Sequence, residues 1–187
     1  MESIRWWAEA ATRTPCPVWG CPRSTAWGHA AAFSLHPLKP LNVWGDGGAV
    51  VTPDNQVGEW LRCYRNHGLK NRDEIAMWGV NQRLQPVQAV VANHVLDRLD
   101  EWVERRIEIA GRLDQGLAGI PEITVPRRFP TRRHSYQLYM VRAQRRDALL
   151  HHLTAAGVEA KVHYPIPLHL QPAAEPLGYT RGDFPMA

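Results

Sequence analysis

One periodic segment constrains this chain more than any other, because it predicts a single helix of unusual length. From Gln85 to about Leu117, apolar side chains recur at steps of three and four residues, the spacing of one face of an α-helix. At about 1.5 Å per residue, this helix is roughly 45 Å long, longer than most small domains need. Such a helix commonly connects two subdomains. We therefore expect the boundary inside it, with one domain over residues 1–110 and a smaller one over 111–187.

The segment before this helix predicts two strands joined through a glycine-rich turn. Ala30–Ser34 is a short run of small and apolar residues, and Ala49–Thr52 is a second run of the same kind. The Gly-Asp-Gly-Gly sequence at 45–48 between them favours a tight turn. Asp54 then provides an N-cap for a short helix that ends near Arg65.

The segment after the long helix predicts a small α+β domain. Alternating residues predict strands over Ile123–Val125 and Ser135–Val141. A helix is expected over Arg146–Ala156, closed by Gly157, and a further strand over Val158–His163.

Composition narrows the classes of protein that this chain can belong to. With 44% hydrophobic and 21% charged residues it is typical of a globular protein. No apolar run approaches the ~18 residues of a membrane span, and the first residues form neither a signal peptide nor a transit peptide, so a cytoplasmic protein without a membrane partner is expected. The net charge of +4 comes from arginines spread along the chain, so nucleic-acid binding is not expected. A basic nucleic-acid binder is kept as a rival, and salt-dependent retention on heparin would identify it.

Lys39 is the first candidate for chemistry. It lies between Pro37 and Pro40, shortly after a predicted strand and before the glycine turn. Such a loop can hold an amine at a strand end facing a cleft, where desolvation lowers its pKa toward the neutral nucleophile. A lysine in a loop is also often only a surface charge, and the pattern alone leaves both interpretations open. His163 and His169 are separated by two prolines and lack the spacing of metal ligands, so no metal site is expected.

Four ordered blocks of sequence closely resemble the DegT/DnrJ/StrS family of sugar aminotransferases. The blocks are Ala31–Lys39 with Trp44–Thr52, Arg65–Gly68, Gly79–Leu84 with Gln88-Ala89, and Val162–His169. The resemblance covers about residues 28–187. It implies an α/β fold class: a partial pyridoxal-phosphate-dependent transferase fold of type I, the remnant of a large α/β domain, followed by a small, incomplete C-terminal α+β domain.

The resemblance also implies pyridoxal 5′-phosphate as cofactor and suggests residues that hold it. Lys39 matches the lysine that bonds covalently to the cofactor and later moves a proton between substrate and cofactor. Ser34 matches a serine whose hydroxyl helps to hold the phosphate. Asn81 matches an asparagine that reaches the phosphate bound by the neighbouring subunit, which implies a homodimer with shared sites. His163 and Tyr164 would line the substrate side of the cleft.

One further residue is implied, and the residues alone leave alternatives to some of these roles. The pyridine nitrogen of the cofactor needs an anion beside it. The family has an aspartate about thirty residues before the lysine, and Glu9 is the nearest counterpart here, although its side chain is one carbon longer. Without the family, Ser34 would equally cap a turn, Asn81 would be a turn or cap residue, and Tyr164 would pack on the small domain.

The activity implied by the resemblance is transfer of an amino group, with glutamate as donor, to a nucleotide-linked keto-sugar in polysaccharide or antibiotic sugar synthesis. Family members are much longer and place several strands and a phosphate-binding helix N-terminus before this region. We therefore expect this chain to be a fragment or the product of a disrupted reading frame, with residues 1–28 atypical of the family. The alternative is a catalytically incompetent fragment or a partner-binding protein that is not an enzyme.

Overall fold

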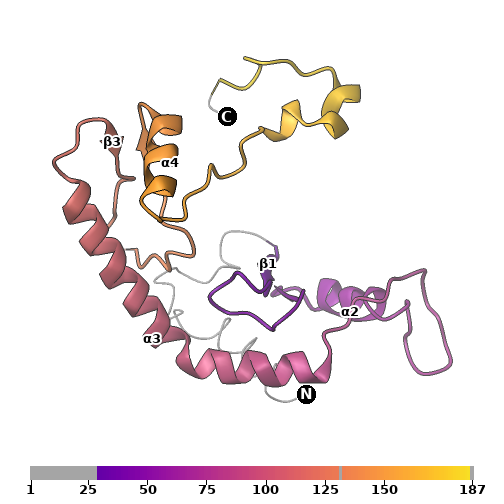
Figure 1. Cartoon of the computed structure of the whole chain (residues 1–187). Coiled ribbons are helices and arrows are strands. Elements are labelled where there is room, and N and C mark those ends of the chain that lie inside the picture. Colours follow the sequence, from indigo (N-terminus) through magenta and orange to yellow (C-terminus); the bar gives the residue numbers. More distant parts are fainter. Residues whose placement is uncertain (1–28, 131, 186–187) are drawn as a thin grey trace. The chain divides into compact units, whose positions relative to one another are not determined.

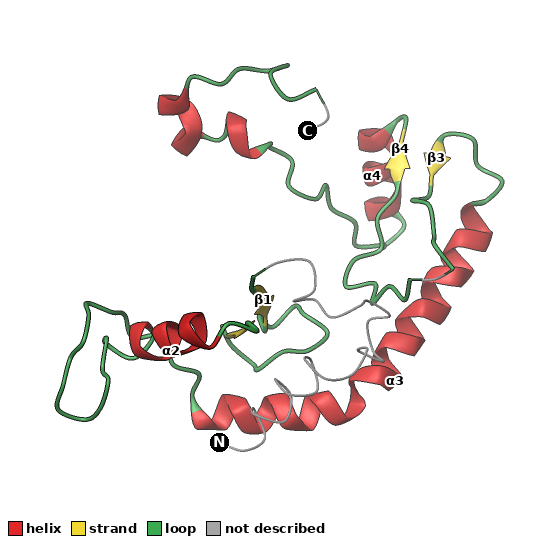
Figure 2. Cartoon of the chain, turned by 180° about the vertical axis from the view of Figure 1, so that it is seen from behind, coloured by secondary structure: helices red, strands yellow, loops and turns green. Residues whose placement is uncertain are grey.

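A computed structural model of the chain describes residues 29–130 and 132–185. Glu9 and the atypical segment 1–28 lie outside the described residues. Figures 1 and 2 show that helices and loops make up most of what is described, with two short pairs of strands.

The contacts of the chain define two compact units. The first extends as far as Pro121 and also includes Val125–Val141, and the second contains Glu122–Thr124 together with Arg142–Ala187. All of the long helix belongs to the first unit. The domain boundary expected after residue 110 stays a prediction.

The two predicted strands are confirmed as β1 (Ala31–Ser34) and β2 (Gly48–Val51), which form an antiparallel pair. Ala31 pairs with Val51 at one end and Ser34 with Gly48 at the other. The predicted turn therefore becomes part of a longer loop, residues 35–47, which leaves β1 and returns to β2.

Helix α2 (Asn55–Tyr64) begins at the predicted N-cap. The Asp54 carboxylate accepts hydrogen bonds from the backbone N–H groups of Gln56 and Val57, at 2.8 and 3.2 Å, and so satisfies donors that the first turn leaves free. After α2 the chain makes a loop and returns beside the end of the helix.

Two glycines permit this return. Gly68 has a φ of 75°, and a Cβ there would lie 1.6 Å from the Met77 carbonyl oxygen. A Cβ at Gly79 would lie 2.4 Å from the Gly68 nitrogen and 2.5 Å from the Tyr64 carbonyl oxygen. The two backbone segments therefore approach more closely than any side chain would allow.

Helix α3 (Pro86–Leu117) confirms the long predicted helix. Proline at its first position fits there, because that residue needs no backbone donor. Its buried positions follow the helical period and are Val95, Leu99, Val103 and Ala110. Within the described part of the chain, no helix combines the length and the apolar composition that a membrane span requires.

The second unit contains β3 (Ile123–Thr124) paired antiparallel with β4 (Arg142–Ala143), and then helix α4 (Arg146–Ala155). The helix confirms the prediction almost to the residue. Two short 3₁₀ helices follow, η2 (Leu168–Leu170) and η3 (Pro172–Leu177).

Two predicted strands are wrong. Ser135–Val141 is irregular because side chains take up its backbone groups: the Tyr136 N–H donates to His134 Nδ1, and the Tyr136 carbonyl accepts from Arg106. Tyr136 also has a φ of 45°, which no strand residue adopts. Val158–His163 pairs with no strand among the described residues, and alternation of side chains cannot by itself satisfy a strand's backbone.

Candidate active site

Lys39 lies in the loop between β1 and β2, which we call the lysine loop (residues 35–47). Two backbone hydrogen bonds close its base: Leu35 N–H donates to the Gly47 carbonyl at 2.8 Å, and Val43 N–H donates to the Leu35 carbonyl at 3.2 Å. The side chains of Leu35 and Val43 are buried, with 6% and 1% of their surface exposed. The lysine loop is therefore anchored by its own small core.

Local hydrogen bonds fix the backbone at Lys39 itself. Its N–H donates to the His36 carbonyl at 2.8 Å, and its carbonyl accepts from Asn42 Nδ2 at 3.2 Å. Pro40, the next residue, is buried, whereas Lys39 is half-buried. A turn held in this way gives the lysine a defined starting point for its side chain.

The three lysines of the chain differ in their charge partners. Lys70 lies 3.6 Å from Glu74, and Lys161 lies 2.7 Å from Glu159. Lys39 forms no ion pair with any residue that the structure describes. Within the described part of the chain, its amine is therefore not held as the counter-charge of a carboxylate.

Ser34 ends β1 at the entrance to the lysine loop. Its Oγ accepts a hydrogen bond from the His36 N–H at 3.3 Å, as a turn-capping serine does. Because a hydroxyl both accepts and donates, its proton remains available for an anionic oxygen. The turn-capping interpretation and the phosphate-binding one are therefore compatible.

Asn81 is held by a bridging arginine to which sequence reasoning assigned no role. Its backbone pairs with Asn66 in an isolated antiparallel bridge. Arg83 Nε donates to Asn81 Oδ1 at 3.0 Å, and Arg83 Nη1 donates to Asn66 Oδ1 at 3.2 Å. With its oxygen engaged by Arg83, the Asn81 amide has its NH₂ group left as a donor. Arg83 lies in a block quoted for the family, but the spacing that makes it bridge two asparagines exists only in the fold.

His163 and Tyr164 belong to the second unit, whereas Lys39, Ser34 and Asn81 belong to the first. The rings of His163 and Tyr164 contact each other with centroids 4.2 Å apart. Tyr164 has a φ of 49° and is 81% exposed. Their assignment to the substrate side of a cleft stays a prediction, as does the assignment of Glu9 to the pyridine nitrogen. No group of three or more metal-binding side chains occurs within residues 29–130 and 132–185.

An ionised cluster on α3 holds the segment that follows β3, and no pattern in the sequence indicated it. The Arg128 guanidinium makes two hydrogen bonds to the Asp114 carboxylate, at 3.1 and 3.2 Å, and the Tyr139 hydroxyl donates to the same carboxylate at 2.7 Å. The hydrogen bonds from Arg128 lower the pKa of Asp114. Partial burial, and then the bond to Asp114, raise the pKa of Tyr139 to about 12. This cluster is structural, because all of its partners lie within one unit and satisfy one another.

The chain has clear similarity to known proteins. The profile of the DegT/DnrJ/EryC1/StrS aminotransferase family matches residues 15–187. The chain is 42% identical over 165 residues to the erythromycin biosynthesis sensory transduction protein EryC1 of Saccharopolyspora erythraea, covering 88% of this chain and 45% of that protein. It is 42% identical over 157 residues to a dTDP-3-amino-3,4,6-trideoxy-α-D-glucose transaminase of Streptomyces venezuelae, covering 84% of this chain and 41% of that enzyme.

Solved structures agree with these matches. The crystal structure of S. venezuelae DesV in complex with a ketimine intermediate superposes with a TM-score of 0.84 at 37% identity, over 99% of this chain and 52% of DesV. The chain thus spans about half the length of the relatives that it matches. The predicted fold class is confirmed: part of the α/β fold of the pyridoxal-phosphate-dependent sugar aminotransferases.

Proposed function

The chain belongs to the DegT/DnrJ/EryC1/StrS aminotransferase family, and from that membership we propose that the protein transfers an amino group to a keto-sugar linked to a nucleoside diphosphate. Glutamate is the proposed donor and pyridoxal 5′-phosphate the proposed cofactor. The naming of the S. venezuelae relative as a dTDP-sugar transaminase supports the substrate class. The observation that carries the proposal is the closed lysine loop, whose lysine has no carboxylate partner among the described residues.

The donor groups of the described residues fit this cofactor. Lys39 offers an amine and Ser34 a hydroxyl proton. Asn81 offers the NH₂ group of its side-chain amide, because Arg83 already binds the amide oxygen. Hydroxyl and amide protons are suitable donors to phosphate oxygens, and an amine is the group that bonds to an aldehyde. When bound, the cofactor supplies that aldehyde and a ring that accepts electrons from the substrate.

In this proposal each residue has a separate task. The Nζ atom of Lys39 would bond to the aldehyde of the cofactor with loss of water, and, once the incoming amine had freed it, would carry a proton between substrate and cofactor. Ser34 orients the phosphate from the same subunit. Asn81 reaches the phosphate of a neighbouring copy, so the active protein is a homodimer. We place this homodimer in the cytoplasm, the location expected from the sequence. His163 and Tyr164 contact the sugar substrate, and Glu9 stands beside the pyridine nitrogen.

Absorbance of the added cofactor tests the role of Lys39. Titrating the full chain with pyridoxal phosphate should produce a near-visible band that sodium borohydride abolishes. Lys39→Arg should remove this band while keeping the charge. Lys70→Arg is the matched control, because Lys70 is an exposed lysine paired with Glu74, and it should leave the band unchanged. A band of equal strength in Lys39→Arg would contradict the proposal.

Turnover distinguishes the enzyme from the alternative of an incompetent fragment or partner-binding protein. With glutamate and a dTDP-keto-sugar, the enzyme should release 2-oxoglutarate in step with the amino-sugar. A chain that forms the band but releases no 2-oxoglutarate would favour the alternative.

A further inference from the structure

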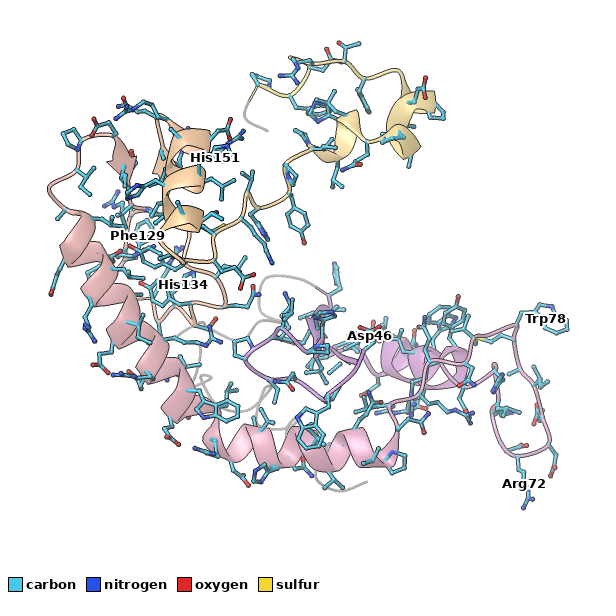
Figure 3. The ribbon with its side chains drawn as sticks, viewed as in Figure 1. Asp46, Arg72, Trp78, Phe129, His134 and His151 are labelled. Atoms are coloured by element: carbon cyan, nitrogen blue, oxygen red, sulfur yellow. The ribbon has the colours of Figure 1, made fainter. Side chains whose placement is uncertain are left out.

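Gln88, in the first turn of α3, makes two hydrogen bonds of opposite sense. Its Oε1 accepts from the Gln85 N–H at 3.1 Å, which closes the start of the helix. Its Nε2 donates to the Asp46 carbonyl at 3.0 Å, across a sequence separation of 42 residues. One side chain therefore both caps the long helix and holds the end of the lysine loop, where Figure 3 labels Asp46.

Two glycines of the lysine loop, Gly45 and Gly47, pack closely around the Gln88 hydrogen bond. A Cβ at Gly45 would lie 3.2 Å from Gln88 Nε2. A Cβ at Gly47 would lie 2.7 Å from Val43 Cγ2 and 3.0 Å from Leu84 Cδ1. The turn thus fits against the start of α3 without room for a side chain, and its backbone carbonyl meets the Gln88 amide directly.

We propose that Gln88 is a positioning residue for Lys39, acting through its hydrogen bond to the Asp46 carbonyl. Asp46 adjoins Gly47, whose carbonyl holds the Leu35 N–H, and Leu35 in turn holds the Val43 N–H. Because Lys39 has no ion pair with the described residues, the path of this loop sets the position of its amine. The inference rests on the proposed function for the chemistry of Lys39, but the hold on the loop can be measured without any cofactor.

A second residue near the start of α3 also contacts the lysine loop. Leu84 lies two residues before α3, and Leu84 and Gln88 together contact the lysine loop. Loss of the Gln88 hydrogen bond to Asp46 should therefore disturb Lys39 more than Asn81, because Arg83 holds Asn81 separately.

Two substitutions separate the two bonds of Gln88. Gln88→Glu keeps the acceptor for Gln85 and suits the helix N-terminus, but sets a carboxylate against the Asp46 carbonyl. Gln88→Lys keeps a donor for that carbonyl, but loses the acceptor and places a positive charge at the helix N-terminus. If Gln88 only caps α3, Gln88→Lys should disturb the structure more than Gln88→Glu. If Gln88 positions the lysine loop, Gln88→Glu should disturb the structure more than Gln88→Lys.

Hydrogen exchange followed by mass spectrometry shows directly which of the two variants disturbs the lysine loop more. In Gln88→Glu, peptides covering residues 35–47 should exchange about five to ten times faster, the effect of losing one hydrogen bond, while peptides within residues 92–117 stay unchanged. Gln88→Lys should leave residues 35–47 near the unaltered rate. Gln115→Glu makes the same chemical change on an exposed position of α3, far from the lysine loop in sequence, and should leave residues 35–47 at the unaltered rate. Circular dichroism is the control, and it should show that each variant keeps its helix content.

The affinity for pyridoxal phosphate supplies the second measurement. Gln88→Glu should weaken formation of the borohydride-sensitive band about fivefold, and Gln88→Lys should weaken it less. Unchanged exchange in residues 35–47 of Gln88→Glu, or greater damage from Gln88→Lys in both measurements, would overturn the inference. If the unaltered chain forms no band at all, the proposed function fails, and the exchange rates alone decide whether Gln88 holds the loop.

Discussion

A single guanidinium engages the oxygen end of the Asn81 amide. Arg83 donates to the side-chain oxygens of both Asn81 and Asn66, so both amides turn their NH₂ groups away from it. A primary amide can otherwise present an acceptor or a donor with equal ease. In this account Arg83 converts Asn81 into a committed donor, the sense that a phosphate needs.

We expect Arg83→Ala to weaken binding of pyridoxal phosphate about five- to tenfold and to leave the weaker binding of pyridoxal, which lacks the phosphate, unchanged. Arg72→Ala is the matched control, because Arg72 lies at the exposed end of the loop after α2, where Figure 3 shows it beyond the helix. Equal losses for the two aldehydes would show that Arg83 supports the fold and not the phosphate contact. The two affinities are measured by the same absorbance titration.

The hydroxyl of Tyr139 should ionise much later than that of an exposed tyrosine. Partial burial and the bond that its neutral form donates to Asp114 raise its pKa to about 12 from an ordinary 10.0. The fold therefore favours the protonated hydroxyl of Tyr139. This preference contributes its full stability at a pH below the pKa that Tyr139 has in the unfolded chain. That contribution is lost as the pH rises from about 10 through about 12.

Ultraviolet titration of tyrosinate should therefore show a late step near 12, and Tyr139→Phe should remove that step. Survival of the late step in Tyr139→Phe, or the absence of any step near 12 in the unaltered chain, would contradict the cluster. Asp114 acts at the other end of the pH range. Because Arg128 lowers its pKa, its contribution is present above its ordinary value of 3.8 and is lost as the pH falls through the lowered value.

Part of the candidate site could be predicted from residue types, because the functional group of a lysine or an asparagine can be recognised without knowing the fold. Lys39, Ser34 and Asn81 could be named from their blocks of sequence. Arg83 and Gln88 stood in the same blocks, yet their roles depend on bonds to residues 17 and 42 positions away. Such partners become visible only once the chain has folded.

At the scale of elements, the return of the chain beside α2 depends on glycine at two positions. Gly79→Ala would place a methyl group 2.4 Å from one backbone nitrogen, so we expect a loss of about 1–3 kcal/mol in the free energy of unfolding. Urea denaturation followed by circular dichroism measures it.

Gly111→Ala is the control for this substitution. Gly111 lies inside α3, and a methyl group added there would have nothing within 4 Å, so alanine should stabilise the chain by about 0.5–1 kcal/mol. Opposite signs for the two changes are the expected result. A neutral Gly79→Ala would show that the two backbone segments can separate without cost.

Elements with a strong local signal were predictable, and those that depend on a distant partner were not. The period of α3 and the Asp54 cap of α2 both act within a few residues. The expected strand over 135–141 fails because its backbone bonds to His134 and Arg106 instead of to another strand. Alternating side chains show that a segment could be half-buried; they do not show what its N–H and C=O groups bind.

At the scale of the molecule, the chain spans about half the length of its relatives, yet the lysine loop is closed entirely by residues of the described part. Its base, its buried side chains and the Gln88 bond all come from the first unit. The central claim is therefore that this unit presents Lys39, and no other lysine, as the amine that bonds to the cofactor.

Mass spectrometry tests that claim most directly, because the chain has only three lysines. The full chain is incubated with limiting pyridoxal phosphate and reduced with borohydride, and the modified peptide is then identified. We expect the pyridoxyl group on Lys39, with little on Lys70 or Lys161, both of which are paired with carboxylates. Equal labelling of the three lysines, or labelling that spares Lys39, would contradict the account.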